Sequence, residues 1–361
     1  MNPMRPALAL AAALLSSARA AAPNSLTVWV PERGQTATLS AAGLKGEDGS
    51  RVPLDLGRFW GQESLERPLP GGYVRLVYAT KSSPTRLEVV QGGKVTASRA
   101  LPEARSTNGF WGTQRGPCLG LQGSSSDGVI VRCFSPDLKS EWAKVPGQVL
   151  NVHVSADGRA AYTVMTDWKL QQPYTETVRI IRHDLLSGKQ TPLSYRVPRD
   201  DQDAEYHRNL ASAYDARETV RFAAELPGER LLICATMTMP KLGCRLDVID
   251  RDARKLFSLQ GDAWVFLPQA TADGQKLYYM GNTLQVWDAR TGKRLASIHD
   301  PLWDKLQQSP LNAYLTPDGT QAAIVTHGLQ PGSGAPDMNS LTAYLYRLSD
   351  GQRLSRFALK P

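Results

Sequence analysis

Residues that could bind a metal ion are few in this chain, and they do not form a recognisable motif. The densest acidic run, residues 200–205, gathers the kind of oxygen ligands that Ca²⁺ prefers. It lacks the ligand spacing and the glycine of an EF-hand loop, and this favours a solvated acidic loop. We therefore predict no metal site.

The histidines are the other candidates for chemistry. His207 and His299 stand beside Tyr206 and Asp300 in stretches that read as loops, and these two could act as an acid or a base. The other three lie in strand-like stretches and are expected to pack or to face solvent: His153, His183 and His327. The sequence has no HExxH motif, no phosphate-binding glycine loop and no G-x-S-x-G elbow. We predict no catalytic residue and no cofactor.

A repeat determines which elements position these residues. Three segments each place an Asp-Gly turn between apolar runs: Val154–Arg159, Ala270–Gln275 and Leu315–Thr320. A further apolar run and a second glycine-containing turn follow each of them: Leu186–Lys189, Arg290–Lys293 and Ser349–Gln352. Asp-Gly between apolar runs is a strong hairpin signal, because glycine accepts the positive φ of a tight turn. Each repeat is therefore expected to form four antiparallel strands.

Weaker copies of this plan span residues 59–101, 111–145 and 222–259, which makes six units. Residues 23–56 contain a further hairpin that could help to complete a seventh unit. Circular closure protects strand edges that an open stack would expose. The expected fold class is all-β: a β-propeller of about seven blades, or six, each a four-stranded antiparallel sheet. Tandem β-sandwiches are the alternative.

The three Asp-Gly segments carry a family resemblance, together with Trp287-Asp288 at the position of a WD dipeptide. They resemble the repeats of bacterial exported β-propellers of the WD40-like, TolB-like and YVTN-like types. The resemblance covers most of the chain and implies the propeller architecture. Propellers of this general type include lactonases, hydrolases and quinoprotein dehydrogenases, so an enzyme stays an alternative, although the fold by itself does not specify an activity.

The repeat also places the four cysteines. Cys118 and Cys133 fall on the second and third strands of one unit, and Cys234 and Cys244 do so in another. An even number of cysteines in an exported chain favours disulfides, and neighbouring antiparallel strands bring such pairs within bonding distance. We predict the pairs Cys118–Cys133 and Cys234–Cys244. A zinc site is the alternative, but the CxxC spacing of such sites is absent.

Propeller geometry sorts the connections between strands onto two faces. The turns between strands one and two, and between strands three and four, are short and form a tight-turn rim. The opposite connections are long, at residues 167–176, 198–217, 299–310 and 328–340. We call their side of the ring the long-loop face, and long loops on a rigid scaffold commonly carry binding residues. The binding residues expected there are Trp168, Lys169, Tyr174, Tyr206, His207, Arg208, Tyr214, Trp303 and Lys305. The other role open to these aromatic side chains is to cap the channel or to hold their own loops.

The start of the chain predicts export. A cationic beginning, an apolar run over residues 7–15 and the small-x-small sequence Ala18-Arg19-Ala20 are typical of a signal peptide over residues 1–20, with cleavage as late as residue 22. Residues 23–361 would then form a single propeller domain. The formal charge of +8 falls to about +6 without Arg5 and Arg19. The basic residues are scattered and no long apolar stretch follows, so we predict neither nucleic-acid binding nor a membrane span.

These observations together predict a monomeric, non-catalytic scaffold in the periplasm or outside the cell. It would bind a protein or another cell-envelope component through the long-loop face. The alternative is a propeller enzyme of the lactonase, hydrolase or quinoprotein type with a site in the central channel. A structural envelope protein without a discrete ligand is a third interpretation.

Overall fold

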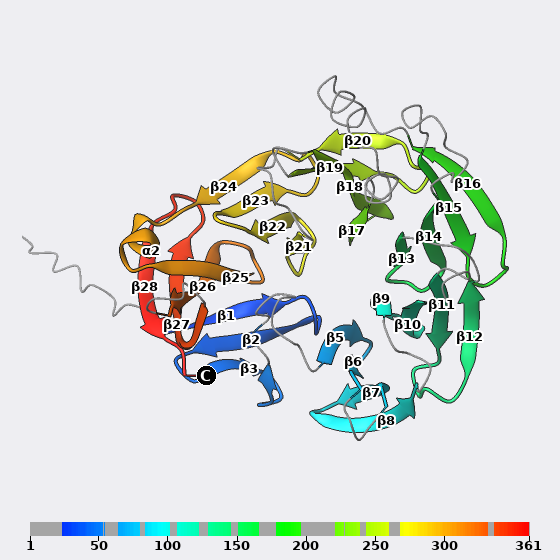
Figure 1. Ribbon diagram of the computed structural model, residues 1–361, viewed down its shortest axis with the longest axis horizontal. Coiled ribbons are helices and arrows are strands. Elements are labelled where there is room, and N and C mark those ends of the chain that lie inside the picture. The colour runs from blue at the N-terminus through cyan, green and yellow to red at the C-terminus, as the bar shows by residue number, and fades with distance from the viewer. Residues whose placement is uncertain are drawn as a thin grey trace, which may run out of the picture.

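Seven four-stranded antiparallel sheets stand in a ring, and the β-propeller expected from the repeat is confirmed (Figure 1). The structure is a computed structural model that describes residues 24–52, 54, 64–79, 84–101, 107–122, 129–145, 151–165, 178–195, 221–226, 228–238, 243–259, 268–330 and 336–360. Each sheet is one blade, and each blade is made of four strands that are consecutive in the chain.

The strands fall into blades in chain order. Blade 1 consists of β1 (Ser25–Val30), β2 (Gln35–Ser40), β3 (Gly43–Gly46) and β4 (Arg51–Val52). Blade 2 consists of β5 (Ser64–Leu69), β6 (Gly72–Val77), β7 (Arg86–Gln91) and β8 (Lys94–Ala100). Blade 3 consists of β9 (Thr107–Thr113), β10 (Gly116–Gln122), β11 (Val129–Phe134) and β12 (Glu141–Val145). Blade 4 consists of β13 (Asn151–Val154), β14 (Ala160–Met165), β15 (Val178–Asp184) and β16 (Gln190–Tyr195).

Blade 5 consists of β17 (Arg221–Leu226), β18 (Arg230–Thr238), β19 (Gly243–Ile249) and β20 (Lys255–Ser258). Blade 6 consists of β21 (Gln269–Ala270), β22 (Lys276–Met280), β23 (Leu284–Asp288) and β24 (Arg294–Ile298). Helix α2 (Pro301–Lys305) leads into blade 7, which is β25 (Gln308–Leu315), β26 (Gln321–Leu329), β27 (Pro336–Arg347) and β28 (Arg353–Ala358). Because residues 25–52 form a whole blade rather than a hairpin added to another one, no blade takes strands from both ends of the chain.

The Asp-Gly turns repeat one hydrogen-bonded geometry. In blade 4, the hydroxyl of Ser155 donates to Asp157 Oδ1 at 2.6 Å, and the same carboxylate oxygen accepts from the backbone N–H of Arg159 at 2.9 Å. The glycine that follows the aspartate has φ of 69° in this turn, which a side chain would disfavour. Blades 6 and 7 repeat the same contacts with a threonine in place of the serine. The pattern Ser/Thr-x-Asp-Gly therefore encodes the first turn of these three blades.

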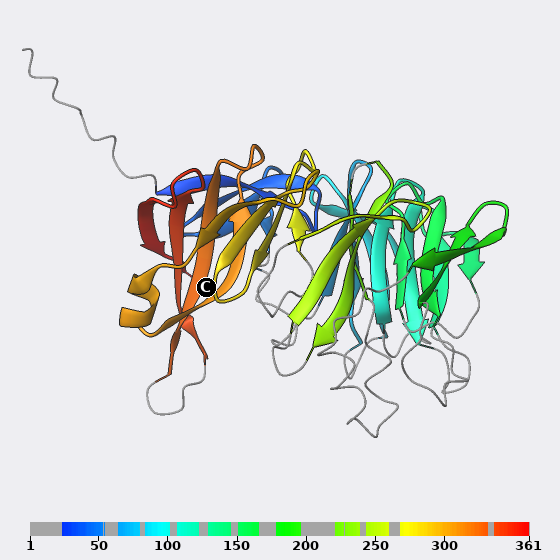
Figure 2. The same cartoon turned by 90° about the horizontal axis from the view of Figure 1, so that it is seen from above.

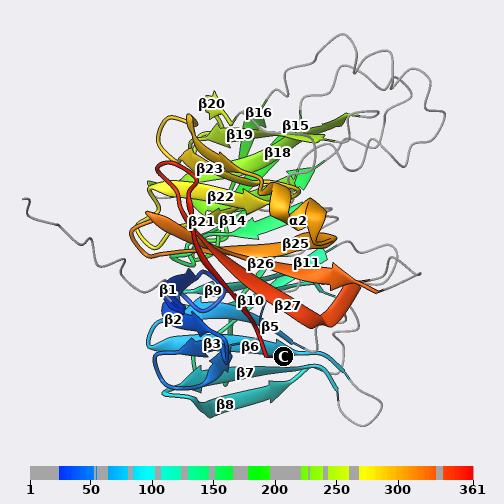
Figure 3. The same cartoon turned by 90° about the vertical axis from the view of Figure 1, so that its left-hand side faces the viewer.

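Packing between neighbouring blades, which we call a seam, is apolar almost all the way round the ring. Within the described residues, six apolar clusters each combine side chains of two neighbouring blades. Trp287 is fully buried between blades 5 and 6 with Leu232 and Val248. Val28 of blade 1 packs in one cluster with Val325 of blade 7, so the two ends of the chain meet through buried side chains (Figure 3).

The seam between blades 1 and 2 is polar. Arg33, in the turn between β1 and β2, is 3% exposed, and its Nε donates to Glu66 Oε2 of blade 2 at 2.5 Å. The guanidinium lies 4.3 Å from the ring centre of Tyr73 and also donates to Ser50 Oγ at 3.0 Å. No apolar cluster of the described residues joins these two blades. A buried ion pair, supported by stacking and further hydrogen bonds, takes the place of apolar packing.

The predicted Cys118–Cys133 disulfide is present. The two residues lie opposite each other on β10 and β11 and are fully buried. The side chains of Cys234 and Cys244 lie outside what the structure describes. The backbone register sets Cys234 opposite Leu246 and Cys244 opposite Met237, and their pairing stays a prediction.

The disulfide should contribute measurably to stability. Closing a loop with a sequence separation of 15 restricts the unfolded chain, so C118A/C133A should lower the free energy of unfolding by about 3 kcal/mol in urea titrations. Non-reducing peptide mapping should find Cys118 linked to Cys133. A map that joined Cys118 to Cys234, or a double variant as stable as the native chain, would contradict this pairing.

The polar seam predicts a specific pattern of variant stabilities. Arg33→Met leaves Glu66 buried without its main partner and should cost on the order of 3 kcal/mol in urea unfolding. R33M/E66Q should lose less than the single variant, because no unpaired charge remains. Arg347→Met, which breaks an exposed pair with Asp350, is the control and should cost under about 1 kcal/mol. Equal losses in Arg33→Met and Arg347→Met would show that the buried pair does not hold the seam.

Candidate binding face

The tight-turn rim uses its polar groups internally. Beyond the bonds within each turn, Gln114 N–H donates to Ala156 O of the next blade at 2.8 Å. Lys276 of blade 6 donates to the carbonyl oxygens of Asp318 and Gly319 in blade 7, both at 2.9 Å. These bonds join the turns of neighbouring blades, so the rim acts as a rigid brace.

On the opposite face, blade 7 carries a projecting hairpin. Strands β26 and β27 continue to pair past the last residue of β28, Gly328 with Asp337 and Leu329 with Pro336, and the Leu329–Pro336 pair also lies beyond the first residue of β25 (Figure 2). Ser340 Oγ accepts from Gly328 N–H at 2.9 Å and donates to Asp337 O at 3.1 Å. These bonds order the hairpin where neighbouring strands no longer support it. It comes from the long connection expected at residues 328–340, more than half of which is strand.

Helix α2 occupies the long connection between blades 6 and 7. Asp300 caps its first turn by accepting from Leu302 N–H at 2.9 Å, and it also accepts from Tyr346 Oη at 2.8 Å and Arg353 Nη1 at 2.7 Å. Burial opposes ionisation of Asp300, but these donors outweigh it and lower the pKa of the carboxyl group. The donors Tyr346 and Arg353 tie the start of the helix to β27 and β28.

Trp303 serves its own loop, one of the two roles considered for it. Its side chain is 1% exposed and packs edge-on against Tyr344, Tyr346 and His299, with ring centres 5.7 to 6.3 Å apart. It therefore presents almost no surface to a partner. Lys305, at the end of the same helix, is exposed as expected. The other predicted binding residues lie outside the described residues: Trp168, Lys169, Tyr174, Tyr206, His207, Arg208 and Tyr214.

Two exposed leucines mark the corner between α2 and the hairpin. Leu306 is 44% exposed and Leu329 is 38% exposed. Gln308, the first residue of β25, pairs with Gly328. Leu306 stands just before β25 and Leu329 just after Gly328, so both leucines lie at the same end of blade 7. Sequence reasoning missed both residues, since nothing local separates an exposed leucine from the many buried ones. The only available signal was the position of each within a long connection.

The histidine candidates for acid–base chemistry have ordinary structural roles where they are described. His299 is half-exposed, and its Nε2 lies 3.1 Å from Asp304 Oδ2. The contact with Asp304 raises the pKa of the imidazole, the carbonyl of Asn282 adds to the rise, and burial opposes it. His183 is buried, contacts Thr163 Oγ1 at 2.9 Å, and has its pKa lowered by desolvation. The hydroxyl of Thr163 beside His183 is itself buried, and the contacts of His299 include no hydroxyl or thiol.

A buried carboxylate lies between blades 4 and 5. Asp247 is fully buried, accepts from Ser258 Oγ at 2.7 Å and from the hydroxyl of Tyr195, and pairs with Lys255 at 3.2 Å. Tyr195 belongs to blade 4 and the other three residues to blade 5, so this cluster joins two blades. Its burial closes it to any substrate, and its role is structural.

Metal and membrane features are absent from the parts of the chain that the structure describes. No group of His, Cys, Asp and Glu residues there has the geometry of a metal site. Within the same residues, no helix has both the length and the apolar character needed to cross a bilayer. An open depression of about 510 Å³ lies at the outer edge of the ring, between β8 and the turn of residues 137–139, and not at the axis.

The two histidines should titrate in opposite directions from the ordinary value of 6.5. His299 should titrate above it, so its contribution to stability is present at low pH and is lost as pH rises through its folded pKa. His183 should titrate below it, so acidification lowers stability. NMR titration should show both shifts, and Asp304→Asn should lower the pKa of His299 alone. A shift of both residues in that variant would contradict the local cause.

Comparisons with known proteins extend only to the fold. The sequence matches no protein family and no curated protein. The β-propeller domain of the Trilobed protease from Pyrococcus furiosus, described as having an open velcro topology, is similar with a TM-score of 0.52 at 10% identity over 89% of this chain and 87% of that one. The Cps50 (Swd1) β-propeller domain from Myceliophteria thermophila has a TM-score of 0.49 at 10% identity, over 92% and 85% of the two chains. BamB from Moraxella catarrhalis has a TM-score of 0.42 at 14% identity, over 80% and 73%. The first of these similarities agrees with the seven four-stranded sheets and shows the β-propeller fold alone.

Proposed function

We propose that this protein is an exported, non-catalytic β-propeller scaffold that binds a protein partner of the cell envelope through its long-loop face. The observation that carries the proposal is the corner formed by α2 and the β26–β27 hairpin. There Leu306 follows a helix held in place by Trp303 and Asp300, and Leu329 lies on a hairpin ordered by Ser340, and both leucines are exposed. A pre-ordered apolar corner suits protein binding, because little conformational entropy is lost on association.

The difference between the two faces supports the same assignment. The tight-turn rim directs its hydroxyls, carboxylates and amides into its own turns, and so offers few unpaired groups to a partner. The long-loop face carries the connections whose length exceeds what joining two strands requires. A buried disulfide between Cys118 and Cys133 suits a chain that works in an oxidising compartment, and it supports export.

An enzyme with a site in the channel is the second candidate function, and the described groups favour it less. Two histidine–carboxylate pairs are described. His299 and Asp304 follow the outermost strand of blade 6 and stand away from the channel. His153 and Glu225, 3.5 Å apart, join the innermost strands of blades 4 and 5, and Glu225 is also held by Ala156 N–H at 2.6 Å, so this pair links two blades. The buried carboxylate of Asp247 is fully enclosed by its partners. A scaffold requires none of these groups to react.

The proposal predicts that polar replacement of the apolar corner weakens partner binding. Crosslinking pull-downs from envelope extract would use residues 23–361 as bait, beside L306S/L329S and the control L256S/L295S. The control removes two leucines of similar exposure, 47% and 48%, from the outer strands of blades 5 and 6. Loss of a central apolar contact costs about 2 kcal/mol, so capture by L306S/L329S should fall at least tenfold.

Equal capture by all three baits would contradict the role of this corner. A further bait, W168A/Y174A, tests the residues proposed from the sequence on the same face. If none of the variants changes what is captured, the long-loop face is not the binding surface, and the channel becomes the surface to probe with small ligands.

A further inference from the structure

Blade 1 has one face that its neighbour, blade 2, covers only in part. Its apolar face, with Val28 and Leu39, packs against blade 7 in a buried cluster. Strand alternation therefore turns the other face toward blade 2. On that face the register aligns one residue from each strand in a row across the sheet: Thr27, Thr38, Lys45 and Arg51. All four side chains are exposed, whereas the residues beside them on the apolar face are buried.

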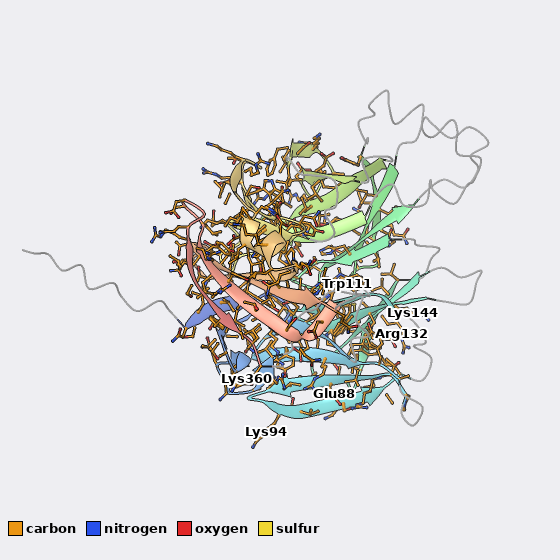
Figure 4. The ribbon with its side chains drawn as sticks, turned by 60° about the vertical axis from the view of Figure 1, so that its left-hand side comes forward. Glu88, Lys94, Trp111, Arg132, Lys144 and Lys360 are labelled. Atoms are coloured by element: carbon orange, nitrogen blue, oxygen red, sulfur yellow. A yellow bond between two sulfur atoms is a disulfide. The ribbon has the colours of Figure 1, made fainter. Side chains whose placement is uncertain are left out.

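Blade 2 turns a charged face toward this row. Its apolar side chains, such as Val74 and Leu76, pack against blade 3, so the opposite face of the same strands is the one turned to blade 1. There the register aligns Glu66, Arg75 and Glu88. Figure 4 shows Glu88 on the cyan blade. Its carboxylate lies 2.6 Å from Arg86 and 3.8 Å from Arg75, whose side chains are 38% and 32% exposed.

The two faces meet only toward the tight-turn rim. The Arg33–Glu66 pair lies there, and Gly34 approaches Pro68 so closely that a Cβ at Gly34 would stand 2.6 Å from the Cβ of Pro68. Farther along the strands, the exposed row of blade 1 shows that the faces have separated. We call the space between this row and the Arg75–Arg86 side of blade 2 the wedge. Toward the tight-turn rim it is closed by the buried Arg33–Glu66 pair.

The described lining of the wedge has an excess of one positive charge. Arg33 and Arg75 neutralise Glu66, and Arg75 and Arg86 surround Glu88. Glu47 and Asp48 lie beside the row, in the turn at the rim, where Thr36 donates to Glu47 and Ser50 N–H donates to Asp48. Among the described residues, no acidic side chain forms an ion pair with Lys45 or Arg51. Thr27 and Thr38 add hydroxyl donors to the same row.

We propose that the wedge binds an extended acidic segment of a partner protein. Carboxylates on alternate residues of an extended chain lie on one side of it, about 7 Å apart, and arginine binds a carboxylate through two parallel hydrogen bonds. The long side chains of Lys45, Arg51, Arg75 and Arg86 reach such groups from both walls. This surface is separate from the Leu306–Leu329 corner, and its occupation does not depend on the function proposed for that corner.

Fluorescence anisotropy with the full chain and a labelled peptide of alternating Glu and Ser tests the wedge. The native chain should bind the peptide, with an affinity that falls as salt rises, and K45E/R51E should lower the affinity at least tenfold. The control K293E/R294E makes the same change in net charge at exposed residues of blade 6 and should leave binding within a factor of two or so. Both variants alter exposed side chains, and matching thermal unfolding would show that they fold.

Three results would overturn the proposal. No binding of the peptide to the native chain would remove it directly. Equal weakening in K45E/R51E and K293E/R294E would show a non-specific response to net charge. A labelled polygalacturonate that binds more tightly than the peptide and is lost in K45E/R51E would assign the wedge to an anionic polysaccharide instead. None of these results bears on the Leu306–Leu329 corner, which these variants leave intact.

Discussion

One four-residue turn, residues 31–34, holds blade 1 in the ring on the side that lacks apolar packing, and the rest of the structure depends on it. A propeller in which no blade takes strands from both ends of the chain has no strand ladder across the junction of its first and last blades, so side-chain packing and isolated hydrogen bonds must hold that junction. Arg33 of this turn reaches Glu66 of blade 2, while Glu32 accepts from Gln269 of blade 6 at 2.8 Å. The turn therefore links blade 1 to blade 2 and to a blade that is not its neighbour. Lys360 N–H adds a bond to Ala41 O at 2.9 Å, where the end of the chain lies beside blade 1 (Figure 4).

A buried arginine is a costly means of closure unless its charge is fully satisfied. Here Glu66, Ser50 and the carbonyl of Arg51 accept from the guanidinium, and Tyr73 stacks on its face. The polar seam leaves blade 1 with a partly uncovered face, which an apolar seam would have buried. The polar contacts that join blade 1 to blade 2 therefore also leave the wedge between them.

The two sides of the ring have different roles: the tight-turn rim supports the fold, and the long-loop face is the proposed binding surface. Hydrogen bonds within and between the Asp-Gly turns make one rim rigid, so longer connections on the other face can vary without loss of the fold. In blade 7 this freedom has produced a helix and a projecting hairpin. Asp300 and Trp303 hold the helix in place, so the exposed leucines beside it are presented on ordered elements.

Much of the fold was predictable because it rests on local chemistry. The Asp-Gly turns, the four-strand repeats and the Cys118–Cys133 pairing all follow from patterns within one blade. The weak Trp111–Val145 copy also folds as a blade, with Leu138 at φ 60° where the stronger copies have glycine. The candidate site was less predictable. Trp303 and Leu306 stand three residues apart in one loop, yet the tryptophan is buried and the leucine is exposed.

The sequence by itself determined the elements of this protein: strand, tight turn and repeat, each set by residues close together in the chain. The tertiary structure alone decided how the circle closes and which side chains face solvent. Arg33 and Glu66 are 33 residues apart, and Glu32 and Gln269 are 237 apart. Nothing in the neighbourhood of either residue specifies its partner, because burial and pairing across a ring depend on where every other blade lies. The polar seam, the wedge and the apolar corner are consequences of that arrangement.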